Sequence, residues 1–365
     1  MNHAALPAAL PAAMHAVLLT GHGGTERLEY RDDVPLPVAG AGEVLIRVGA
    51  AGINNTDINT RTGWYSKMPA NPGSLTGWSG EPCEFPRIQG ADVCGTVVAV
   101  GPGIGAALIG ERVLVEPAFD GRAAGGRLAY LGSECDGAFA QFVKVPAPFA
   151  HRITSDLSDA ELASFPVSYS AAENMLSRAG VVAGERVLVT GASGGVGSAA
   201  VQLAKCRGAR VVAIAGEAKA AMVAALGADR VLGRSADLLA TVGPDSVDVV
   251  LDVTGGPGFA QLLGVLVCGG RYAVAGAIAG AQVELDLRTL YLKDLRLLGC
   301  TALDAGVFAR LVGLIERGAI RPLVARSFPL RDIVLAQQEF LEKRHVGKLV
   351  LIPPAVAEDD TQPRA

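Results

Sequence analysis

The first part of the chain alternates hydrophobic and polar positions over short stretches that glycines separate. The stretches 14–21 and 42–53 are rich in Val, Leu and Ile, and 87–101, 111–117 and 137–146 repeat the pattern. Short apolar runs that end at glycine or proline are typical of β-strands. Many such strands with few helices predict a small, irregular β-barrel for about the first 150 residues.

Two Gly/Pro-rich stretches, 66–86 and 118–136, interrupt this part and are expected to form loops. The first carries Trp78, Cys83 and Phe85, large or reactive side chains that we expect to form a lid or an oligomer contact.

The periodicity changes after Ser158. Residues 158–180 have helical spacing, with Ser158 as the expected N-cap and acidic residues in the first turn. From 185 to 302, apolar strands alternate with helical segments, which predicts a parallel sheet covered on both faces. An amphipathic helix at 307–318 follows, and 333–353 read as a helix and a final strand.

Composition excludes several classes of function. Half of the 365 residues are hydrophobic and 19% are charged, as in a folded globular chain. The net charge of −4, with no basic run, argues against nucleic-acid binding. Charged, Gly or Pro residues interrupt every long apolar run, so no membrane span is expected. The six cysteines form no CxxC pair and the N-terminus lacks a signal-peptide pattern, which together predict a cytoplasmic protein with reduced thiols.

The clearest chemical motif is a glycine-rich turn between a strand and a helix at 186–205. Ala192, Gly194 and Gly197 take the three positions of the G-x-G-x-x-G pattern. The bare backbone at Gly194 would admit a pyrophosphate at the helix N-terminus, and Gly197 would let the helix pack closely on the strand. The strand–turn–helix context favours a dinucleotide site over a purely structural turn.

The choice of dinucleotide depends on the end of the next strand, at 209–216. That end carries no acid that could bind a ribose hydroxyl. The cation Lys219 follows it, and Arg234 follows the third strand. We therefore expect NADPH. NADH stays possible because Glu217 also lies nearby, and Lys219 has the alternative of a solvated lysine at a helix start.

Five segments carry a family resemblance: AGINNTDINTRTGWY from residue 51, IQGADVCGTVVAVG from 88, GERVLVTGASGGVGSAAVQLAK from 184, LGAD from 226 and HVGKLVLIP from 345. Over residues 14–353 the chain resembles the medium-chain dehydrogenase/reductases, and within them the zinc-free quinone oxidoreductase and enoyl reductase branch. The resemblance implies an α/β fold in which a GroES-like β-barrel, built from both chain ends, joins a Rossmann doubly wound parallel sheet. The implied division is a disordered extension at 1–13, a catalytic domain at 14–165 and 306–354, a nucleotide-binding domain at 166–305, and a disordered tail at 355–365.

The resemblance also implies that no metal is bound. The positions of the zinc ligands in the zinc alcohol dehydrogenases fall on Asn54, Ala91 and about Pro166, and Cys135 alone remains of the structural cysteines. An amide, a methyl group and a proline ring cannot replace thiolate and imidazole ligands.

Without a metal, hydride transfer to a quinone or an activated C=C bond is favoured over alcohol chemistry, because the resulting anion is delocalised. The reaction needs hydrogen-bond donors near the developing oxyanion. Asn54, Tyr65 and Arg61 are the catalytic candidates, with Asn54 placed beside the nicotinamide by the resemblance. A packing role is the alternative for Tyr65, and Asp57 is expected to hold the loop by hydrogen bonds.

The resemblance extends the cofactor site to residues at strand and helix ends along the chain. They are Asn54, Thr56, Ser170, Ser193, Gly194, Gly195, Val196, Lys219, Arg234, Thr254, Gly276, Thr301 and Lys348.

Three functions are compatible with these features. The first is an NADPH-dependent reductase of quinones or α,β-unsaturated carbonyls, with a small-molecule substrate and a homodimeric state. The second is a zinc-independent alcohol or ketone dehydrogenase, and the third is an NADPH-binding protein without turnover.

Overall fold

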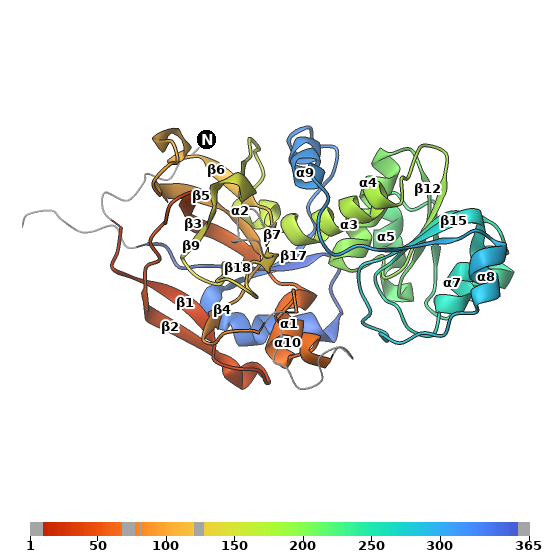
Figure 1. Cartoon of the computed structure of the whole chain (residues 1–365), viewed down its shortest axis with the longest axis horizontal. Coiled ribbons are helices and arrows are strands. Elements are labelled where there is room, and N and C mark those ends of the chain that lie inside the picture. The colour runs from red at the N-terminus through yellow and green to blue at the C-terminus, as the bar shows by residue number, and fades with distance from the viewer. Residues whose placement is uncertain (1–9, 68–76, 81, 120–127, 357–365) are drawn as a thin grey trace, which may run out of the picture. The chain divides into compact units, whose positions relative to one another are not determined.

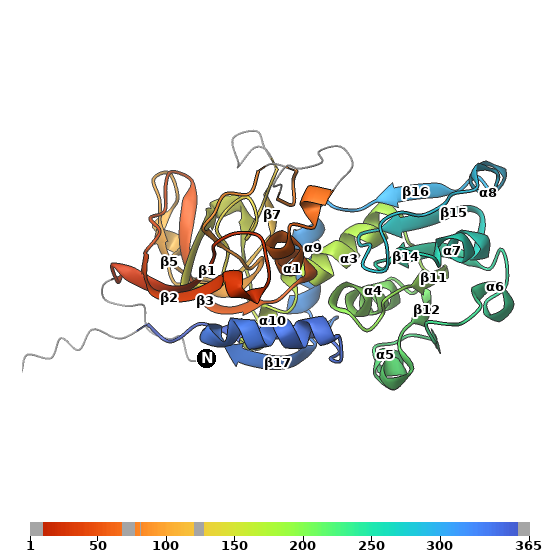
Figure 2. The same cartoon turned by 90° about the horizontal axis from the view of Figure 1, so that it is seen from below.

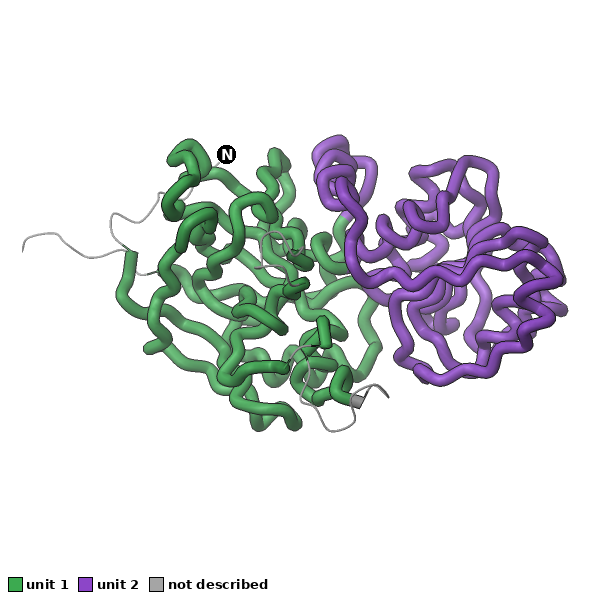
Figure 3. Tube along the Cα trace, in the orientation of Figure 1, with its two compact units in different colours: residues 1–167, 322–365 green, residues 168–321 purple. Residues whose placement is uncertain are grey.

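The structure is a computed structural model that describes residues 10–67, 77–80, 82–119 and 128–356. The chain forms two compact units (Figure 3): unit 1 comprises residues 1–167 and 322–365, and unit 2 comprises residues 168–321. Helix α9 (Val307–Glu316), which the sequence analysis assigned to the first domain, belongs to unit 2. Of the two ends expected to be disordered, 1–9 and 357–365 lie outside the described residues, and Ala13 already begins strand β1.

Unit 1 is rich in β-structure, as predicted. Its main sheet has the strand order β10-β6-β5-β3-β18-β17, with β9 also paired to β3, and two smaller sheets have the orders β2-β1-β4 and β7-β8. The strands are β1 (Ala13–Leu19), β2 (Leu28–Pro35), β3 (Glu43–Gly52), β4 (Arg87–Ile88), β5 (Asp92–Val100), β6 (Arg112–Val115), β7 (Ala118–Phe119), β8 (Ala129–Tyr130), β9 (Phe142–Pro146), β10 (Ala150–Arg152), β17 (Val324–Pro329) and β18 (Lys348–Ile352), and the helices are α1 (Asn55–Thr62), α2 (Asp159–Leu162) and α10 (Ile333–Glu342).

The end of the chain returns to this sheet, which confirms the predicted final strand. Strand β18 runs parallel to β17 and antiparallel to β3, where Val350 faces Gly52. On the other side of β3, Gly52 faces Asp92 of β5. Three segments that are distant in sequence thus bring the starts of β18 and β5 to the end of β3. The glycine is required there, because a Cβ at Gly52 would lie 2.5 Å from an Asp92 carboxylate oxygen.

The single helix expected over 158–180 is two helices, α2 and α3 (Pro166–Arg178). Ser158 caps α2 as predicted, in a capping box with Glu161. The break falls just before Pro166, which cannot donate a backbone hydrogen bond and so starts a new helix.

Unit 2 is a six-stranded parallel sheet with the order β13-β12-β11-β14-β15-β16. Figure 2 shows β16, β15, β14, β11 and β12 following one another in this order. This is the doubly wound order, in which the chain reverses direction across the sheet between its first and fourth strands. The elements are β11 (Arg186–Val189), β12 (Arg210–Ile214), β13 (Arg230–Leu232), β14 (Val247–Asp252), β15 (Leu266–Val274), β16 (Arg296–Gly299), α4 (Gly195–Cys206), α5 (Ala220–Ala225), α6 (Leu238–Thr241), α7 (Phe259–Val265), α8 (Leu287–Leu292) and α9.

Within the described ranges, no helix combines the length and the apolar character that a membrane crossing requires. All six cysteines are free.

Candidate functional site

The phosphate turn of unit 2 joins β11 to α4. Gly194 is the N-cap of α4, and the nearest atom to a Cβ placed there is the Gly191 carbonyl oxygen at 3.4 Å, so the space above this backbone is open. Gly197, one turn further, has no such space, because a Cβ there would lie 2.2 Å from the same oxygen. The turn therefore leaves room for a ligand beside the helix N-terminus, where backbone N–H groups favour an anion.

Two cations lie near the end of β12. The guanidinium of Arg234 lies 3.5 Å from the position that a Cβ of Gly216 would take. Burial lowers the pKa of Lys219, and the charge of Arg234 lowers it further. Glu217 is exposed. A pair of neighbouring cations that repel each other is a site that an anionic group would stabilise.

The other predicted cofactor residues of unit 2 differ in accessibility. Ser170 and Ser193 are buried, Thr254 and Gly276 are half-buried, and Thr301 is exposed. Thr254 follows β14, Gly276 follows β15, and Thr301 follows β16. These three residues therefore lie at the carboxyl edge of the sheet, where doubly wound folds bind their ligands.

In unit 1, the first turn of α1 fixes the position of Asn54. Asn54 is the N-cap, and its backbone N–H donates to the Asp57 carboxylate over 2.7 Å in a capping box. The Gln89 amide donates to the Asp57 carbonyl oxygen. These contacts confirm the structural role predicted for Asp57.

Asn54 also belongs to a buried polar cluster with Asp92 and Lys348, which we call the Asn54 cluster. The Asn54 amide donates to the Asp92 carboxylate over 2.8 Å, and the Lys348 ammonium lies 2.5 Å from that carboxylate. Lys348 also donates to the Asn54 side-chain oxygen. The remaining Asp92 oxygen accepts the Val167 N–H. Both ends of the Asn54 amide are therefore held, and the ammonium of Lys348 is used within unit 1.

Asp57 lies beside this cluster and has a strongly shifted pKa. Burial raises the pKa of its carboxyl group to about 7, with the charge of Asp92 adding to the rise, against the Asn54 and Gly90 N–H groups and the charge of Lys348. The ordinary pKa of this group is 3.8. Between about pH 4 and 7, therefore, the folded chain still holds a proton that the unfolded chain has already released.

Asp57→Asn should remove a pH dependence of stability. Relative to the variant, the free energy of unfolding of the wild type should fall by up to about 1.4 kcal/mol per pH unit as the pH rises from 4 to 7. Above pH 7 the difference in free energy of unfolding between the two proteins should be constant. Asn keeps the cap acceptor, so the fold should be unchanged. Urea unfolding at several pH values measures this, and parallel curves for the two proteins would contradict it.

Arg61 lies on α1 and joins that helix to α10. It is 2% exposed, and its guanidinium donates to the Gln337 side-chain oxygen over 2.9 Å and to the Gly23 carbonyl oxygen over 2.8 Å. Figure 1 shows α1 and α10 side by side. These contacts support a structural role for Arg61, whereas the sequence analysis made it a catalytic candidate.

Tyr65 begins a short 3-10 turn after α1 and is half-buried. Its ring meets that of Trp64 edge-on at 5.5 Å. Burial raises the pKa of its phenol, against the nearby side chains of Asn59 and Thr56. The phenol therefore stays protonated and able to donate a hydrogen bond. Thr56, also half-buried, lies on the first turn of α1.

The sequence analysis missed Tyr130 as a neighbour of Tyr65. Tyr130 is 6% exposed, and its ring lies 4.6 Å from that of Trp78. Burial raises the pKa of its phenol, and the charge of Asp92 adds to the rise. The ring of Phe85 meets the ring of His22 edge-on at 4.9 Å. Trp78 and Phe85 thus pack within the chain, while residues 68–76 and 81 of the predicted loop lie outside the described ones.

The residues at the expected zinc positions do not fit a zinc ion. The Asn54 amide is occupied by Asp92 and Lys348, Ala91 is a buried methyl group, and Pro166 offers no side-chain donor. In the part of the chain that the structure describes, no group of three or more His, Cys, Asp or Glu side chains is arranged to hold a metal ion.

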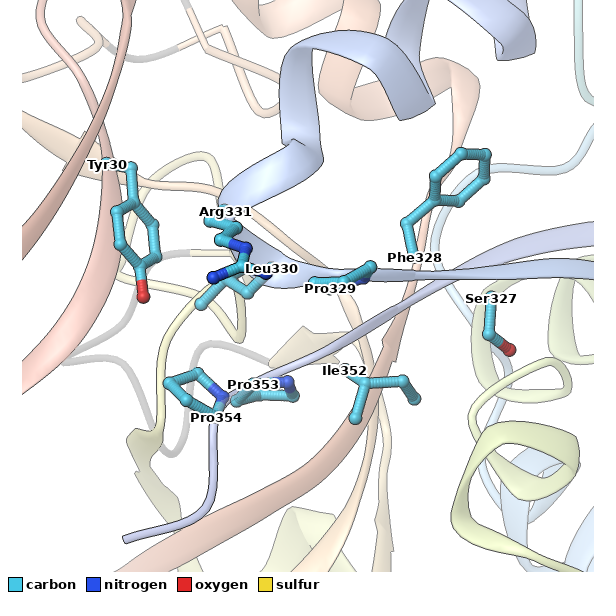
Figure 4. Close-up of a pocket in the computed structure, with 9 residues that line it drawn as sticks. All are labelled: Tyr30, Ser327, Phe328, Pro329, Leu330, Arg331, Ile352, Pro353 and Pro354. Atoms are coloured by element: carbon cyan, nitrogen blue, oxygen red, sulfur yellow. The ribbon is translucent and has the colours of Figure 1, made fainter. Parts of the chain in front are cut away.

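A concavity of about 460 Å³ lies elsewhere in unit 1, where β17 and β18 end (Figure 4). Tyr30, Arg331 and Pro354 line it together with neighbouring residues of these strand ends. The predicted site residues are not among those that line it.

Comparison with known proteins identifies the family. Residues 40–155 match the alcohol dehydrogenase GroES-like domain, and residues 195–317 match the zinc-binding dehydrogenase domain. The chain belongs to the medium-chain dehydrogenase/reductases and is an oxidoreductase, as the sequence analysis expected.

Individual relatives cover nearly the whole chain. An acryloyl-coenzyme A reductase of Metallosphaera sedula is 31% identical over an alignment of 350 residues that covers 93% of this chain and 99% of the relative. A quinone oxidoreductase of Rattus norvegicus is 27% identical over an alignment of 353 residues that covers 93% of this chain and 98% of the relative. A solved structure from Sinorhizobium meliloti 1021, described as an alcohol dehydrogenase, is 47% identical with a TM-score of 0.88. The match covers 94% of this chain and 98% of that structure's chain.

Proposed function

We propose that this chain is an NADPH-dependent, zinc-independent reductase that transfers a hydride to a quinone or an α,β-unsaturated carbonyl compound. The observation that carries the proposal is the Asn54 cluster, in which an ion pair and an amide fill the position of a metal ligand. A substrate whose anion is delocalised needs no Lewis acid, and the quinone and acryloyl-coenzyme A reductases among the relatives act on such substrates.

Each unit carries its own set of proposed site residues. In unit 2, Ser193, Gly194, Gly195 and Val196 would hold the pyrophosphate, and Thr254, Gly276 and Thr301 the nicotinamide half. A reduced dinucleotide supplies the hydride when bound. In unit 1, the protonated phenol of Tyr65 would donate a hydrogen bond to the oxyanion that forms on the substrate. The Asn54 amide, already bonded to Asp92 and Lys348, would fix the start of α1. Thr56 and Ser170 are further proposed cofactor contacts, and Lys348 acts by holding Asn54.

Alcohol or ketone dehydrogenation is the second candidate, because the relative of 47% identity is described as an alcohol dehydrogenase. A panel of quinones, enones, ketones and alcohols, assayed with both dinucleotides, separates the two. We expect oxidation of NADPH by quinones or enones, no stoichiometric zinc by elemental analysis, and activity that survives chelators. Turnover of alcohols alone, or one zinc per chain, would overturn the proposal.

The preference for NADPH is tested at Lys219. Lys219→Ala removes the proposed charge-assisted contact to the 2′-phosphate. It should weaken NADPH binding by about tenfold and leave NADH binding nearly unchanged. Lys205→Ala is the matched control, since Lys205 lies in the same unit but pairs with Asp229. Fluorescence titration gives the four dissociation constants. Equal losses of both nucleotides in Lys219→Ala would show that Lys219 supports the fold instead.

We also propose that the protein is a homodimer that works in the cytoplasm. Strand β16 is an edge of the unit 2 sheet, and Leu297 on it is 39% exposed. On the neighbouring α8, Leu287, Tyr291 and Leu292 are 64%, 62% and 68% exposed. Exposed apolar side chains at a sheet edge fit a partner of the same kind.

A further inference from the structure

Asp252 is a buried carboxylate of unit 2 to which the proposed function assigns no role. It ends β14 and is 0% exposed. One of its oxygens accepts the Thr190 hydroxyl at 2.5 Å, the Thr254 hydroxyl and N–H at 2.9 and 2.8 Å, and the Gly255 N–H at 3.1 Å. The other accepts the Tyr272 hydroxyl at 2.5 Å. The carboxylate therefore joins the end of β11, the loop after β14, and β15.

These contacts keep the carboxylate ionised. Burial acts to raise the pKa of Asp252, but the hydrogen bonds from Thr190, Tyr272, Thr254 and Gly255 outweigh burial and lower it. All five donors are neutral groups. The negative charge is thus stabilised by dipoles without being cancelled by a cation among them.

The strand order would bring this charge close to one half of a bound dinucleotide. Lys219 and Arg234 follow β12 and β13, the phosphate turn follows β11, and Asp252 ends the next strand, β14. Neighbouring strands are about 4.8 Å apart. A dinucleotide with its 2′-phosphate near Lys219 and its pyrophosphate at Gly194 would extend its nicotinamide half toward β14 and β15. The turn and the loop after β14 are in close contact, since a Cβ at Gly191 would lie 3.0 Å from the Thr254 side chain.

We propose that Asp252 sets the redox preference of the nucleotide site, favouring the oxidised over the reduced dinucleotide more than a neutral residue would. The inference rests on the proposed function, because it requires a bound nicotinamide. The oxidised ring carries one positive charge and the reduced ring none, while the rest of the molecule is the same. For two unit charges roughly 10 Å apart in protein surroundings, the interaction energy corresponds to a change on the order of tenfold in the ratio of the two affinities.

Asp252→Asn tests this by removing the charge and keeping the shape. The Asn carbonyl can accept from Thr190 and Thr254, and its amide can donate to Tyr272. We expect the ratio of the dissociation constant of NADP⁺ to that of NADPH to rise about tenfold, chiefly through weaker NADP⁺ binding. Affinity for the adenosine bisphosphate half alone should be unchanged.

Tyr272→Phe is the matched control, because it removes one hydrogen bond of the network and leaves the charge. Its ratio should stay within about twofold of the wild type. An unchanged ratio in Asp252→Asn, or the same rise in Tyr272→Phe, would overturn the inference. Both dissociation constants are measured on the same protein sample, so their ratio does not depend on the fraction of the protein that is folded. If Asp252→Asn folds too poorly to be measured, Asp252→Ser replaces it. Wild-type protein that binds neither nucleotide would overturn the proposed function instead.

Discussion

Gly197→Val should lower the melting temperature of unit 2. Gly194→Val should leave the melting temperature nearly unchanged and abolish nucleotide binding. At Gly197 the new Cβ would lie 2.2 Å from the Gly191 carbonyl oxygen and 2.7 Å from the Ala192 Cα, so backbone must move. A loss of roughly 3 kcal/mol lowers the melting temperature by about 5–10 °C in a unit of this size.

At Gly194 the substitution meets no such obstacle. The nearest atom is 3.4 Å away, and the backbone angles of −83° and 172° suit any residue. Valine would instead occupy the space into which the pyrophosphate must fit. Thermal unfolding and NADPH titration of both variants measure the two effects. Normal NADPH binding by Gly194→Val would show that the turn does not carry the cofactor.

Lys348→Met should be among the most destabilising single substitutions in unit 1. Methionine matches the length of the side chain but leaves the Asp92 carboxylate, 0% exposed, without its cation. Removing one partner of a buried ion pair typically costs about 3–5 kcal/mol. Urea unfolding measures this loss as a lower free energy of unfolding.

A second substitution tests the cause. Asp92→Asn in the Lys348→Met background removes the unpaired charge and keeps an acceptor for the Val167 N–H, so it should restore part of the lost stability. Lys144→Met is the control, because Lys144 pairs with Glu43 while 45% exposed and should change stability by less than about 1 kcal/mol. A Lys348→Met protein as stable as the control would contradict the importance of the buried pair.

The sequence by itself determined the fold class and the main features of the unit 2 site. The strands of unit 2 are near-continuous apolar runs that alternate with helices, a pattern typical of a parallel sheet. The phosphate turn is contiguous in sequence, so Gly194 and Gly197 have roles that local geometry fixes. The prediction for Lys219 rests on the same kind of local signal, because Lys219 follows the end of β12 after a short turn.

Other features depended on competing local signals. Ser158 marked a helix start, but the proline eight residues later divided the expected helix in two. The expected domain boundary near residue 306 differed from that of the compact units because α9 packs within unit 2, and an amphipathic pattern shows that a face is buried without showing against which unit.

Only the tertiary structure decided the Asn54 cluster. Asn54 lies 38 residues from Asp92 and 294 from Lys348, and these side chains meet because β3 pairs with β5 on one side and with β18 on the other. Strand register is set by the packing of whole sheets, which no local pattern encodes. The sequence marked Lys348 as a cation near the end of the chain, and the pairing of β18 gave that cation a buried carboxylate. Burial, in turn, is what raises the pKa of Asp57, since desolvation is a property of the folded surroundings and not of the residue.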